Sequence, residues 1–511
     1  MAQVLPFNGF YAGSDPKNSA RECVNYMPVR HDSGSLSDYT LETTTGITGP
    51  ISRSFTSNPG IVISDVKTWG NITFGPIGAK TICASSGRLL MSTNGTQIQY
   101  WDISTSAAFY DVRFALGTDK VLINSRSVSA SQSGWVWDGG SSDPVAVDYT
   151  AQLDPFGNEN IADVAYFGSR YLLMSEAESA ANPNRGRVYY SDIEDPSTYD
   201  PLGFFRALGQ SSKNTGMHVL NGRLYLFSDD GYTVWSVTPN VNTPFLPQRG
   251  SEGSIGLLDP MGKCENNGVL YFIGRDGGKL GLYAMAGGSP GKISTPAIDS
   301  ILNDDSSKSN IRCFSFYDAD RSIIAFSIGN NTFCLDSEGG EFHKRSTEGG
   351  RWDVVGAGYT AENNNQQVFI GSTTTLNTGS FYFVNFGLSA TSIGTEFGAT
   401  VDRKLVTSPF NSDGVSNIVQ ELSFQTSIDY SSLSPVTLPD LGLSVSNDFG
   451  KSYGVQRLSA FDADGENTKL LRFMSIGFFR QAFVFKLETS NIYPHKILKM
   501  LTRLKKGFRQ I

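Results

Sequence analysis

The chain has 511 residues, of which only 18% are charged, and a formal net charge of −8 at pH 7. Residues 451–511 carry 12 Lys and Arg against 4 Asp and Glu, so the rest of the chain is acidic, and this balance argues against a nucleic-acid-binding domain as the whole protein. The 54 glycines, 33 phenylalanines and 21 tyrosines favour short strands joined by tight turns over helices.

Residues 1–59 are predicted to form an irregular N-terminal arm, because turn signals such as Asn8-Gly9 and Asp15-Pro16 recur in it. Its first residues lack the basic and apolar regions of a signal peptide, and no apolar stretch in the chain is long enough for a membrane span. We therefore expect synthesis in a reducing cytoplasm, where the cysteines remain small buried thiols. The five cysteines are Cys23, Cys83, Cys264, Cys313 and Cys334.

Residues 60–390 repeat a unit of strand, tight turn and strand. One copy, residues 221–237, contains NGRLYLF, then DG, then TVWSV, and a second spans residues 267–283. Alternating β-branched and aromatic residues broken by Asn-Gly or Asp-Gly are a strong hairpin signal. About six such units, spaced by about 40 to 50 residues, predict an irregular β-propeller, in which residues 352–385 either complete the last blade or close the ring. The units lie near 60–103, 110–148, 160–206, 215–245, 264–300 and 310–350.

A short helix is predicted over residues 295–303 as a linker between blades, because its apolar residues have helical spacing and Pro296 suits a first turn. Residues 391–511 do not continue the repeated hairpin unit and are predicted to form a β-sandwich or barrel-like domain. Its predicted strands are 422–428, 442–445, 470–476 and 479–487. The lysine-rich stretch 496–509 favours a solvated or intersubunit strand edge, with contact to an acidic partner or a phosphate as the alternative.

Residues 446–453 read SNDFGKSY, which fits the Asp-box pattern found in sialidases and many other β proteins. In such a turn the aspartate caps its own backbone, the glycine takes a left-handed conformation and the aromatic residue packs beneath. We interpret the motif as a folding device, because a single copy outside the propeller does not predict a sialidase.

Other formal matches to catalytic motifs lack the context that the chemistry needs. Residues 287–291 (GGSPG) fit G-x-S-x-G, but no helical pattern follows the serine, so a loop is expected and not a nucleophile elbow. Residues 462–466 resemble the start of a calcium loop without its later glycine and glutamate, and we expect a hairpin tip there. The acidic pairs at 229–230 and 318–320 are expected in turns.

The four histidines have no spacing typical of metal ligation or general-base catalysis. They are His31, His218, His343 and His495. No phosphate loop is present either, since neither Gly278-Lys279 nor Gly291-Lys292 has the surrounding residues that the motif requires. We therefore predict no catalytic, cofactor-binding or metal-binding residue, and no enzyme.

Three segments occur in the order known from one protein family. The first is ECVNYMPV at 22–29, followed by TGIT at 45–48; the second is RVYYSDIEDPSTY at 187–199; the third joins residues 443–454 to LRF at 471–473. Together they resemble the tail hub, or nozzle, protein of short-tailed bacteriophages, the group also called packaged DNA stabilisation proteins. The resemblance spans nearly the whole chain.

This resemblance implies a structural virion protein of the tail, with no cofactor and no enzymatic residues. Family members form a hexameric ring beneath the portal and its adaptor protein, and the ring continues the channel for double-stranded DNA. A tail needle or plug closes the channel, and tailspikes or tail fibres attach around it. DNA is expected to pass without sequence-specific binding, and an acidic wall suits this role because each neutralised phosphate strengthens attachment to DNA.

Two other classes of function stay open at this point. One is a virion propeller that binds a receptor or glycan through exposed aromatics such as Trp135 and Trp137, for which a strand and turn within the second blade is the structural alternative. The other is a propeller glycosidase, which needs two carboxylates in one cleft, one of them with a raised pKa.

Overall fold

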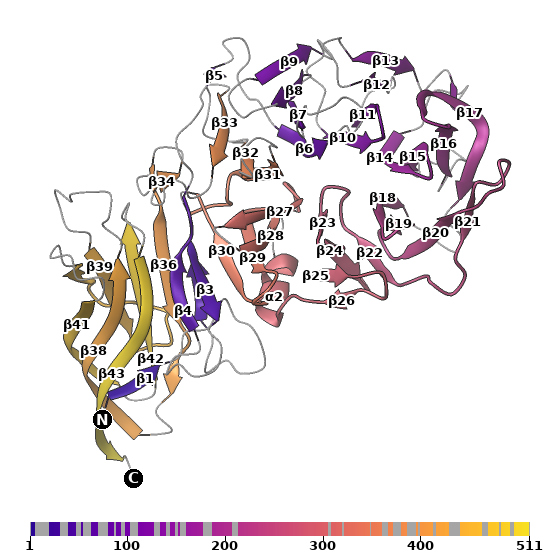
Figure 1. Ribbon diagram of the computed structural model, residues 1–511. Helices are drawn as coiled ribbons and strands as arrows, with labels where there is room; N and C mark the ends of the chain where they lie inside the picture. The colour runs from indigo at the N-terminus through magenta and orange to yellow at the C-terminus, as the bar shows by residue number, and fades with distance from the viewer. Residues whose placement is uncertain are drawn as a thin grey trace.

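In the computed structural model, helix α2 accompanies strands β1 to β43 among the described residues, so the fold is all-β (Figure 1). Six small sheets and one end of a longer sheet form a ring, which we call the propeller, and the rest of that sheet forms a sandwich with a second long sheet. The structure describes residues 2–5, 20–30, 39–46, 53–54, 63–69, 80–85, 88–92, 98–102, 111–126, 133–138, 144–148, 152–153, 160–176, 187–206, 213–304, 308–318, 321–347, 349–359, 366–370, 380–385, 395–396, 399–411, 415–428, 440–461, 469–479, 482–490 and 495–509.

The propeller blades are antiparallel sheets that follow one another along the chain, and we number them one to seven. Blade one contains β6 (Ile63–Trp69), β7 (Lys80–Ser85), β8 (Arg88–Ser92) and β9 (Ile98–Asp102). Blade two contains β10 (Asp111–Leu116), β11 (Val121–Arg126), β12 (Ser133–Trp137) and β13 (Val145–Asp148). Blade three contains β14 (Asn160–Phe167), β15 (Arg170–Glu176), β16 (Arg187–Asp192) and β17 (Asp195–Arg206). Blades four and five are β18 (Asn214–Leu220), β19 (Arg223–Ser228), β20 (Tyr232–Val237) and β21 (Phe245–Pro247); and β22 (Ile255–Leu257), β23 (Lys263–Asn266), β24 (Val269–Asp276), β25 (Lys279–Met285) and β26 (Gly291–Lys292). Blades six and seven are β27 (Arg312–Asp318), β28 (Arg321–Ile328), β29 (Asn331–Asp336) and β30 (Phe342–Arg345); and β31 (Val354–Tyr359), β32 (Gln366–Ile370), β33 (Ser380–Asn385) and β5 (Arg53–Ser54).

The described strands thus form seven blades, where about six were expected. Residues 352–385 do not complete blade six, because they contain three strands of their own, and β5 from the N-terminal region adds the fourth through Ser380↔Ser54 and Phe381↔Arg53. The innermost strand of blade seven, β31, lies beside β6 of blade one. The last blade therefore combines strands from both ends of the propeller sequence and closes the ring.

The predicted hairpins are confirmed where Asn-Gly pairs occur. Asn221 and Gly222 have φ values of 50° and 71°, and Asn267 and Gly268 have 50° and 74°. Two consecutive positive φ values are the geometry of a type I′ turn, which matches the twist of the two strands that it joins. These turns connect β18 to β19 and β23 to β24.

The short helix is also confirmed, as α2 (Pro296–Asp304). Thr295 caps it by accepting a hydrogen bond from the N–H of Ile298 at its side-chain oxygen (3.4 Å). Ile298 and Leu302 are fully buried against Leu280 and Leu282 of blade five. The helix therefore covers apolar side chains of blade five and leads the chain to blade six.

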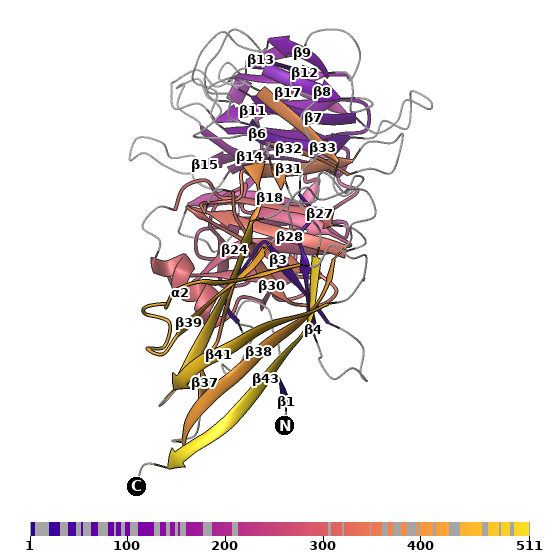
Figure 2. The ribbon, with the colours of Figure 1, turned by 90° about the vertical axis from the view of Figure 1, so that its left-hand side faces the viewer.

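The C-terminal domain is a sandwich of two sheets that share one apolar core. One sheet contains β1 (Ala2–Leu5), β3 (Tyr26–Arg30), β4 (Tyr39–Thr43), β43 (His495–Arg509), β38 (Val415–Ile428) and β41 (Lys469–Phe479). The other contains β2 (Ala20–Val24), β36 (Asp402–Thr407), β42 (Ala482–Ser490), β39 (Asp440–Ser446), β40 (Arg457–Ala460) and β37 (Phe410–Asn411), and a separate pair is β34 (Thr395–Glu396) with β35 (Ala399–Thr400). The long strands β38, β41 and β43 run away from the propeller (Figure 2).

The N-terminal residues differ from the irregular arm that was expected. β1, β3 and β4 belong to one sheet of the sandwich and β2 to the other, and Cys23, Tyr26 and Leu41 are fully buried in the shared core. β2 also pairs in parallel with β30 of blade six, so one sheet runs from the propeller into the sandwich. The start of the chain therefore belongs structurally with its end.

The first part of the lysine-rich C-terminal stretch, residues 496–503, is not a strand edge. β43 pairs with β38 on one side, and its residues 496–503 meet β4 and β1 on the other side, so this part lies inside the sheet. Among the described strands, residues 504–509 pair with β38 alone. Ile497 and Met500 point into the core, whereas Lys496 is exposed and lies 2.8 Å from the Glu42 carboxylate. The expectation of an edge was wrong for residues 496–503 because lysines alternate here with buried apolar residues, a pattern that an internal strand with one solvated face also has.

Candidate functional site: the propeller axis and the junction with the sandwich

A cavity of about 610 Å³ lies on the propeller axis and is lined by β10, β14, β18, β23, β27 and β31, one strand from each of blades two to seven. A concave site with a few converging polar groups is the default place to look for a ligand. Its charged lining residues are Arg113, Asp163, Lys263, Glu265 and Arg312.

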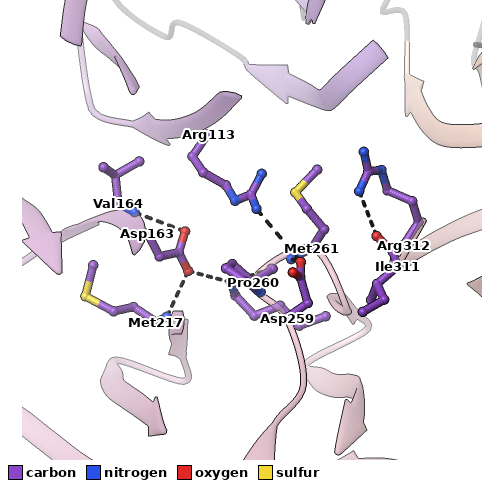
Figure 3. A network of polar contacts seen from close by, with 10 residues as sticks. Arg113, Asp163, Val164, Met217, Asp259, Pro260, Met261, Ile311 and Arg312 are labelled. Atoms are coloured by element: carbon purple, nitrogen blue, oxygen red, sulfur yellow. Dashed lines mark hydrogen bonds and ion pairs between the residues drawn. The ribbon is translucent and has the colours of Figure 1, made fainter. Parts of the chain in front are cut away.

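Asp163 is the centre of the polar network at this axis (Figure 3). The register of β14 shifts between Ile161 and Asp163, and such a bulge redirects a side chain. The Asp163 carboxylate accepts hydrogen bonds from the N–H of Val164 (3.0 Å) and from the N–H of Met217 in β18 (2.8 Å). Lys263 Nζ, from β23, lies 2.6 Å from the same carboxylate. One buried carboxylate therefore joins blades three, four and five.

The other charged groups at the axis also contact neighbouring protein groups. Arg113, whose side chain is 4% exposed, lies 3.9 Å from the Asp259 carboxylate, and His218 Nε2 lies 3.1 Å from Glu265 Oε2. Arg312 donates to the backbone carbonyl of the residue before it (2.7 Å). A B-form duplex, whose major groove alone is about 12 Å wide, does not fit into a cavity of about 610 Å³. DNA therefore does not pass along the propeller axis.

A second polar site joins the propeller to the sandwich. Arg345 of β30 forms a fully buried ion pair with Asp318 of β27, and its guanidinium lies 4.8 Å from the centre of the Trp352 ring. Thr45, which follows β4, donates to Asp318 from its backbone N–H (3.3 Å) and its hydroxyl, and its carbonyl accepts from Arg345 (3.3 Å). A segment near the N-terminus thus completes a buried ion pair of blade six.

Asn25 connects three parts of the chain at this junction. It lies between β2 and β3 with a φ of 55°, a conformation that asparagine tolerates better than most residues. Its N–H donates to the Lys344 carbonyl (2.8 Å), and its side-chain amide donates to the carbonyls of Ser346 (3.0 Å) and Asp402 (2.7 Å). Its side-chain oxygen accepts from the Ser346 N–H (3.0 Å). Asn25 therefore holds blade six to β36 of the sandwich, beside a cavity of about 440 Å³.

Glu396 of β34 is buried at the same junction. Burial raises the pKa of its carboxyl to about 7, although the charge of Arg345, hydrogen bonds from Trp352 and Thr347 and the charge of Arg403 act in the opposite direction. Trp352 Nε1 donates to Glu396 at 3.2 Å and the Thr347 hydroxyl donates at 3.3 Å. This carboxyl therefore changes charge near neutral pH inside the contact between propeller and sandwich.

The outer face of the sandwich carries exposed apolar side chains at a sheet edge. β41 ends its sheet among the described strands, and its residues Met474 and Phe478 are 57% and 52% exposed. Ile418 of β38, the cross-strand partner of Phe478, is 37% exposed. We call these three side chains the β41 patch. Exposed apolar edges are typical of surfaces that another chain covers.

The Asp-box residues lie in the turn after β39. The Asp448 carboxylate accepts hydrogen bonds from the N–H groups of Lys451 (3.0 Å) and Ser452 (2.9 Å), and the hydroxyls of Ser446 and Ser452 donate to it. These bonds hold the pKa of Asp448 well below its usual range. Gly450 has a φ of 83°, so the geometry agrees with a self-capped turn.

The other predicted motifs are separated in the structure. Residues 287–290 form a bend that leads into β26, and helix α2 begins only at Pro296, so no helix follows the serine directly as a nucleophile elbow requires. Trp135 and Trp137 lie in β12 of blade two, 7% and 1% exposed, as the structural alternative required, so they present no stacking surface for a sugar. His343 is fully buried, and burial lowers the pKa of its imidazole well below the usual range.

Three predictions fall partly or wholly outside the described residues: those for His31, for residues 462–466 and for Asp320. The side chain of Cys83 lies outside them too. Cys23, Cys313 and Cys334 are buried as expected, whereas Cys264 is only partly buried because it borders the axial cavity. Within the described part of the chain, no three His, Cys, Asp or Glu side chains are grouped to hold a metal ion. No described helix has the length and hydropathy of a membrane span.

Sequence reasoning missed the residues that hold the junction together. Asp318 was expected in a turn, but it is the last residue of β27 and fully buried. The alternation of inward-facing and outward-facing residues along β27 could have placed Asp318 on the inner face of that strand. Its partners Arg345 and Thr45, however, are distant in sequence. Two segments that carry the family resemblance, 22–29 and 45–48, each contribute a residue to this junction, because Asn25 and Thr45 contact blade six.

Comparisons with known proteins place the propeller in a sequence family. Solved structures that match the chain include a streptogramin B lyase (10% identity, 66% of this chain and 97% of that chain covered, TM-score 0.40) and an exo-β-1,3-galactanase from Phanerochaete chrysosporium (12% identity, 77% and 95% covered, TM-score 0.30). A third is the β-propeller domain of Cps50 (Swd1) from Myceliophteria thermophila (9% identity, 66% and 99% covered, TM-score 0.41). At these identities and scores the likeness says nothing about activity, and no curated protein sequence matches the chain. The family model described as bacteriophage P22 Gp10, β-propeller, matches residues 80–381, which is more than half of the chain, and the protein therefore belongs to this bacteriophage family.

Proposed function

We propose that this protein is the tail hub, or nozzle, subunit of a short-tailed bacteriophage. In this proposal it forms a homohexameric ring below the portal and its adaptor protein, continues the DNA ejection channel and helps to retain the packaged genome. The observation that carries the proposal is the family match over residues 80–381. The role is structural and has no chemical step.

The small cavity on the propeller axis favours a DNA channel between several subunits over a channel through one propeller. Its cavity of about 610 Å³ is crossed by the contact between Asp163 and Lys263, and a duplex does not fit there. A subunit of this shape conducts DNA only when several copies surround a common axis. A head-to-tail ring gives such an axis, because each subunit then uses two different surfaces and rotation closes the assembly.

The β41 patch supplies one of these two surfaces. Met474, Phe478 and Ile418 are each more than one third exposed, and the backbone of β41 has no described strand on its outer side. Arg457 of β40 donates to the carbonyls of Met474 (2.6 Å) and Ser475 (3.1 Å), which covers only part of this edge. In the proposed ring a neighbouring copy covers the remainder. The adaptor, a tailspike or fibre, and a needle or plug are further partners in the tail.

Native mass tests the proposal directly. We expect the purified protein, alone or after addition of the phage adaptor ring, to reach the mass of a hexamer by light scattering, and negative-stain images to show a ring with a central hole. A protein that stays monomeric with and without the adaptor would contradict the proposal.

A matched pair of variants tests the surface. M474K/F478K places two cations on the β41 patch and is expected to prevent ring formation while leaving the unfolding midpoint of the monomer within a few degrees of the wild type. The control is L202K, at another strongly exposed apolar residue (83%), in β17 at the far end of the propeller from the sandwich (Figure 1). If L202K prevents the ring and M474K/F478K does not, the assembly uses the propeller rim and not the β41 patch.

A further inference from the structure

Two cysteine thiols lie in contact beside the propeller axis. Cys264 is in β23 and Cys313 in β27, neighbouring strands of blades five and six, and their Sγ atoms are 3.1 Å apart. Neither cysteine is part of a disulfide in this structure. A disulfide has an Sγ–Sγ distance of about 2.0 Å, so bond formation requires an approach of about 1 Å.

The backbone around the two thiols is fixed by other contacts. The Cys313 N–H donates to the Met261 carbonyl (2.8 Å), which ties β27 to the segment before β23. Cys264 pairs with Tyr271 in blade five, and Cys313 pairs with Phe326 in blade six. Both strands are thus held in their own ladders, with the two thiols in contact between the blades.

The cavity on the axis gives small molecules access to the pair. Both cysteines line this cavity, and Cys264 is the more exposed of the two, since Cys313 is 8% exposed. Cys23 and Cys334 differ in both respects. They are fully buried, and burial raises the pKa of both thiols, that of Cys334 to about 12, so they present almost no thiolate.

We propose that Cys264 and Cys313 are a redox-active pair that closes to a disulfide between blades five and six on contact with a low-molecular-weight disulfide of the oxidised glutathione class. The Cys264 thiolate attacks one glutathione sulfur, the glutathione S–S bond breaks, and one glutathione leaves as a thiolate that takes up a proton. The Cys313 thiolate then attacks the Cys264 sulfur of the mixed disulfide and releases the second glutathione. Two protein thiols lose two electrons and two protons, and one glutathione disulfide gains them as two glutathione thiols.

The crosslink acts on the stability of the propeller. It joins positions 49 residues apart and fixes two neighbouring blades to each other. A crosslink of this kind restricts the unfolded chain more than the folded one, whose strands already lie side by side. A protein made in a reducing cytoplasm and later exposed to an oxidising medium would thus become more stable after assembly.

The test uses the native full-length protein. It is incubated with oxidised glutathione or with dithiothreitol, denatured in acid, alkylated with iodoacetamide and digested, and the peptides are identified by mass. We expect a linked peptide pair containing Cys264 and Cys313 only after oxidation, together with an unfolding midpoint a few degrees higher that dithiothreitol restores to its starting value. C264S and C313S are expected to lose the shift.

Two results on the pair itself would overturn the proposal, and a third concerns the other cysteines. One is full alkylation of Cys264 and Cys313 after oxidation of the native protein, and the other is a stable glutathione adduct on Cys264 without the linked peptide. Both are read on the wild-type chain, so they remain decisive if C264S or C313S fails to fold. A linked peptide that includes Cys23 or Cys334 in place of this pair would contradict it as well.

Discussion

Lys263 Nζ lies 2.6 Å from the Asp163 carboxylate, and this contact joins blade five to blade three across the propeller axis. Asp163 also accepts the N–H of Met217 in blade four. The side chains of Lys263 and Asp163 are only 10% and 4% exposed. The propeller therefore has a buried ion pair on its axis. The two charged residues come from blades three and five, and the backbone of blade four, which lies between them, donates a further hydrogen bond to the carboxylate.

Loss of one partner of this pair is expected to cost more than loss of both. D163A leaves the Lys263 ammonium buried and removes the acceptor of the Met217 N–H, so we expect a destabilisation of about 3 to 5 kcal/mol. D163L/K263M removes both charges and is expected to recover part of the loss. The measurement is chemical unfolding of the full-length chain.

The control for this prediction is an exposed ion pair. Glu42 and Lys496 are 2.8 Å apart with exposures of 24% and 52%, and E42Q is expected to cost at most about 1 kcal/mol because solvent screens such pairs. If D163A costs no more than E42Q, the axial pair does not contribute to blade packing. If the double variant is less stable than D163A, the buried charges stabilise the ring independently of each other.

Glu396 predicts an unusual dependence of stability on pH. Burial raises the pKa of this carboxyl from the ordinary 4.5 to about 7, so the folded chain binds more protons than the unfolded chain between these values. The contribution to stability is therefore greatest below pH 4.5 and is lost as the pH rises to about 7, by about 3 kcal/mol in total.

E396Q separates this effect from other titrating groups. Glutamine stays neutral, so the variant is expected to be more stable than the wild type at pH 8 and similar to it at pH 5. Thermal unfolding midpoints of both proteins across this range provide the measurement. Identical slopes for the two proteins would show that Glu396 is not the group that titrates. The charged groups that act on Glu396 from the elements around it are Arg345 and Arg403.

Local features of the fold could be predicted from the sequence, whereas pairings between distant segments could not. Asn-Gly pairs specify type I′ turns by themselves, so the hairpins at 221–222 and 267–268 were predicted correctly. The bond between Tyr26 and His495 joins residues 469 positions apart (2.8 Å), and no local pattern indicates it. For the same reason the strands near the N-terminus were taken for an irregular arm.

The candidate sites show the same difference between local contacts, which the sequence predicts, and contacts of distant segments, which it does not. Ser446 and Asp448 form a turn within a few residues, and its self-capping was expected from the motif. Asp163 and Lys263 come from different blades, and their approach depends on a bulge in β14 that hydrophobic alternation does not reveal. The sequence also contained Cys264 and Cys313 without any sign that two neighbouring blades bring them into contact.

Removal of the N-terminal strands is expected to unfold the sandwich. Deletion of residues 1–46 takes away β1 to β4, removes Tyr26 and Leu41 from the core and exposes new edges on β43 and β36. We expect insoluble or aggregated protein, because unpaired strand edges associate. Soluble yield and circular dichroism provide the measurement.

A shorter deletion is the control. Removal of residues 2–5 takes away only β1, which pairs with β43 at four positions, and is expected to leave a soluble and cooperatively folding protein. A chain lacking residues 1–46 that unfolds cooperatively at the wild-type midpoint would show that the N-terminal strands are accessory.

Gly256 of β22 predicts how tightly blades four and five approach each other. A Cβ atom at this position would lie 2.3 Å from the backbone carbon of Asp229 and 2.6 Å from the nitrogen of Asp230, and backbone atoms do not move aside cheaply. G256A is therefore expected to destabilise the chain by about 1 to 3 kcal/mol or more, as overpacking does.

Gly288 offers a matched control, because its Cβ would meet nothing within 4 Å and its φ is not in the left-handed region, so G288A is expected to be neutral or slightly stabilising. Equal unfolding midpoints for the two variants would mean that the contact between the turn of blade four and β22 adapts to an added methyl group.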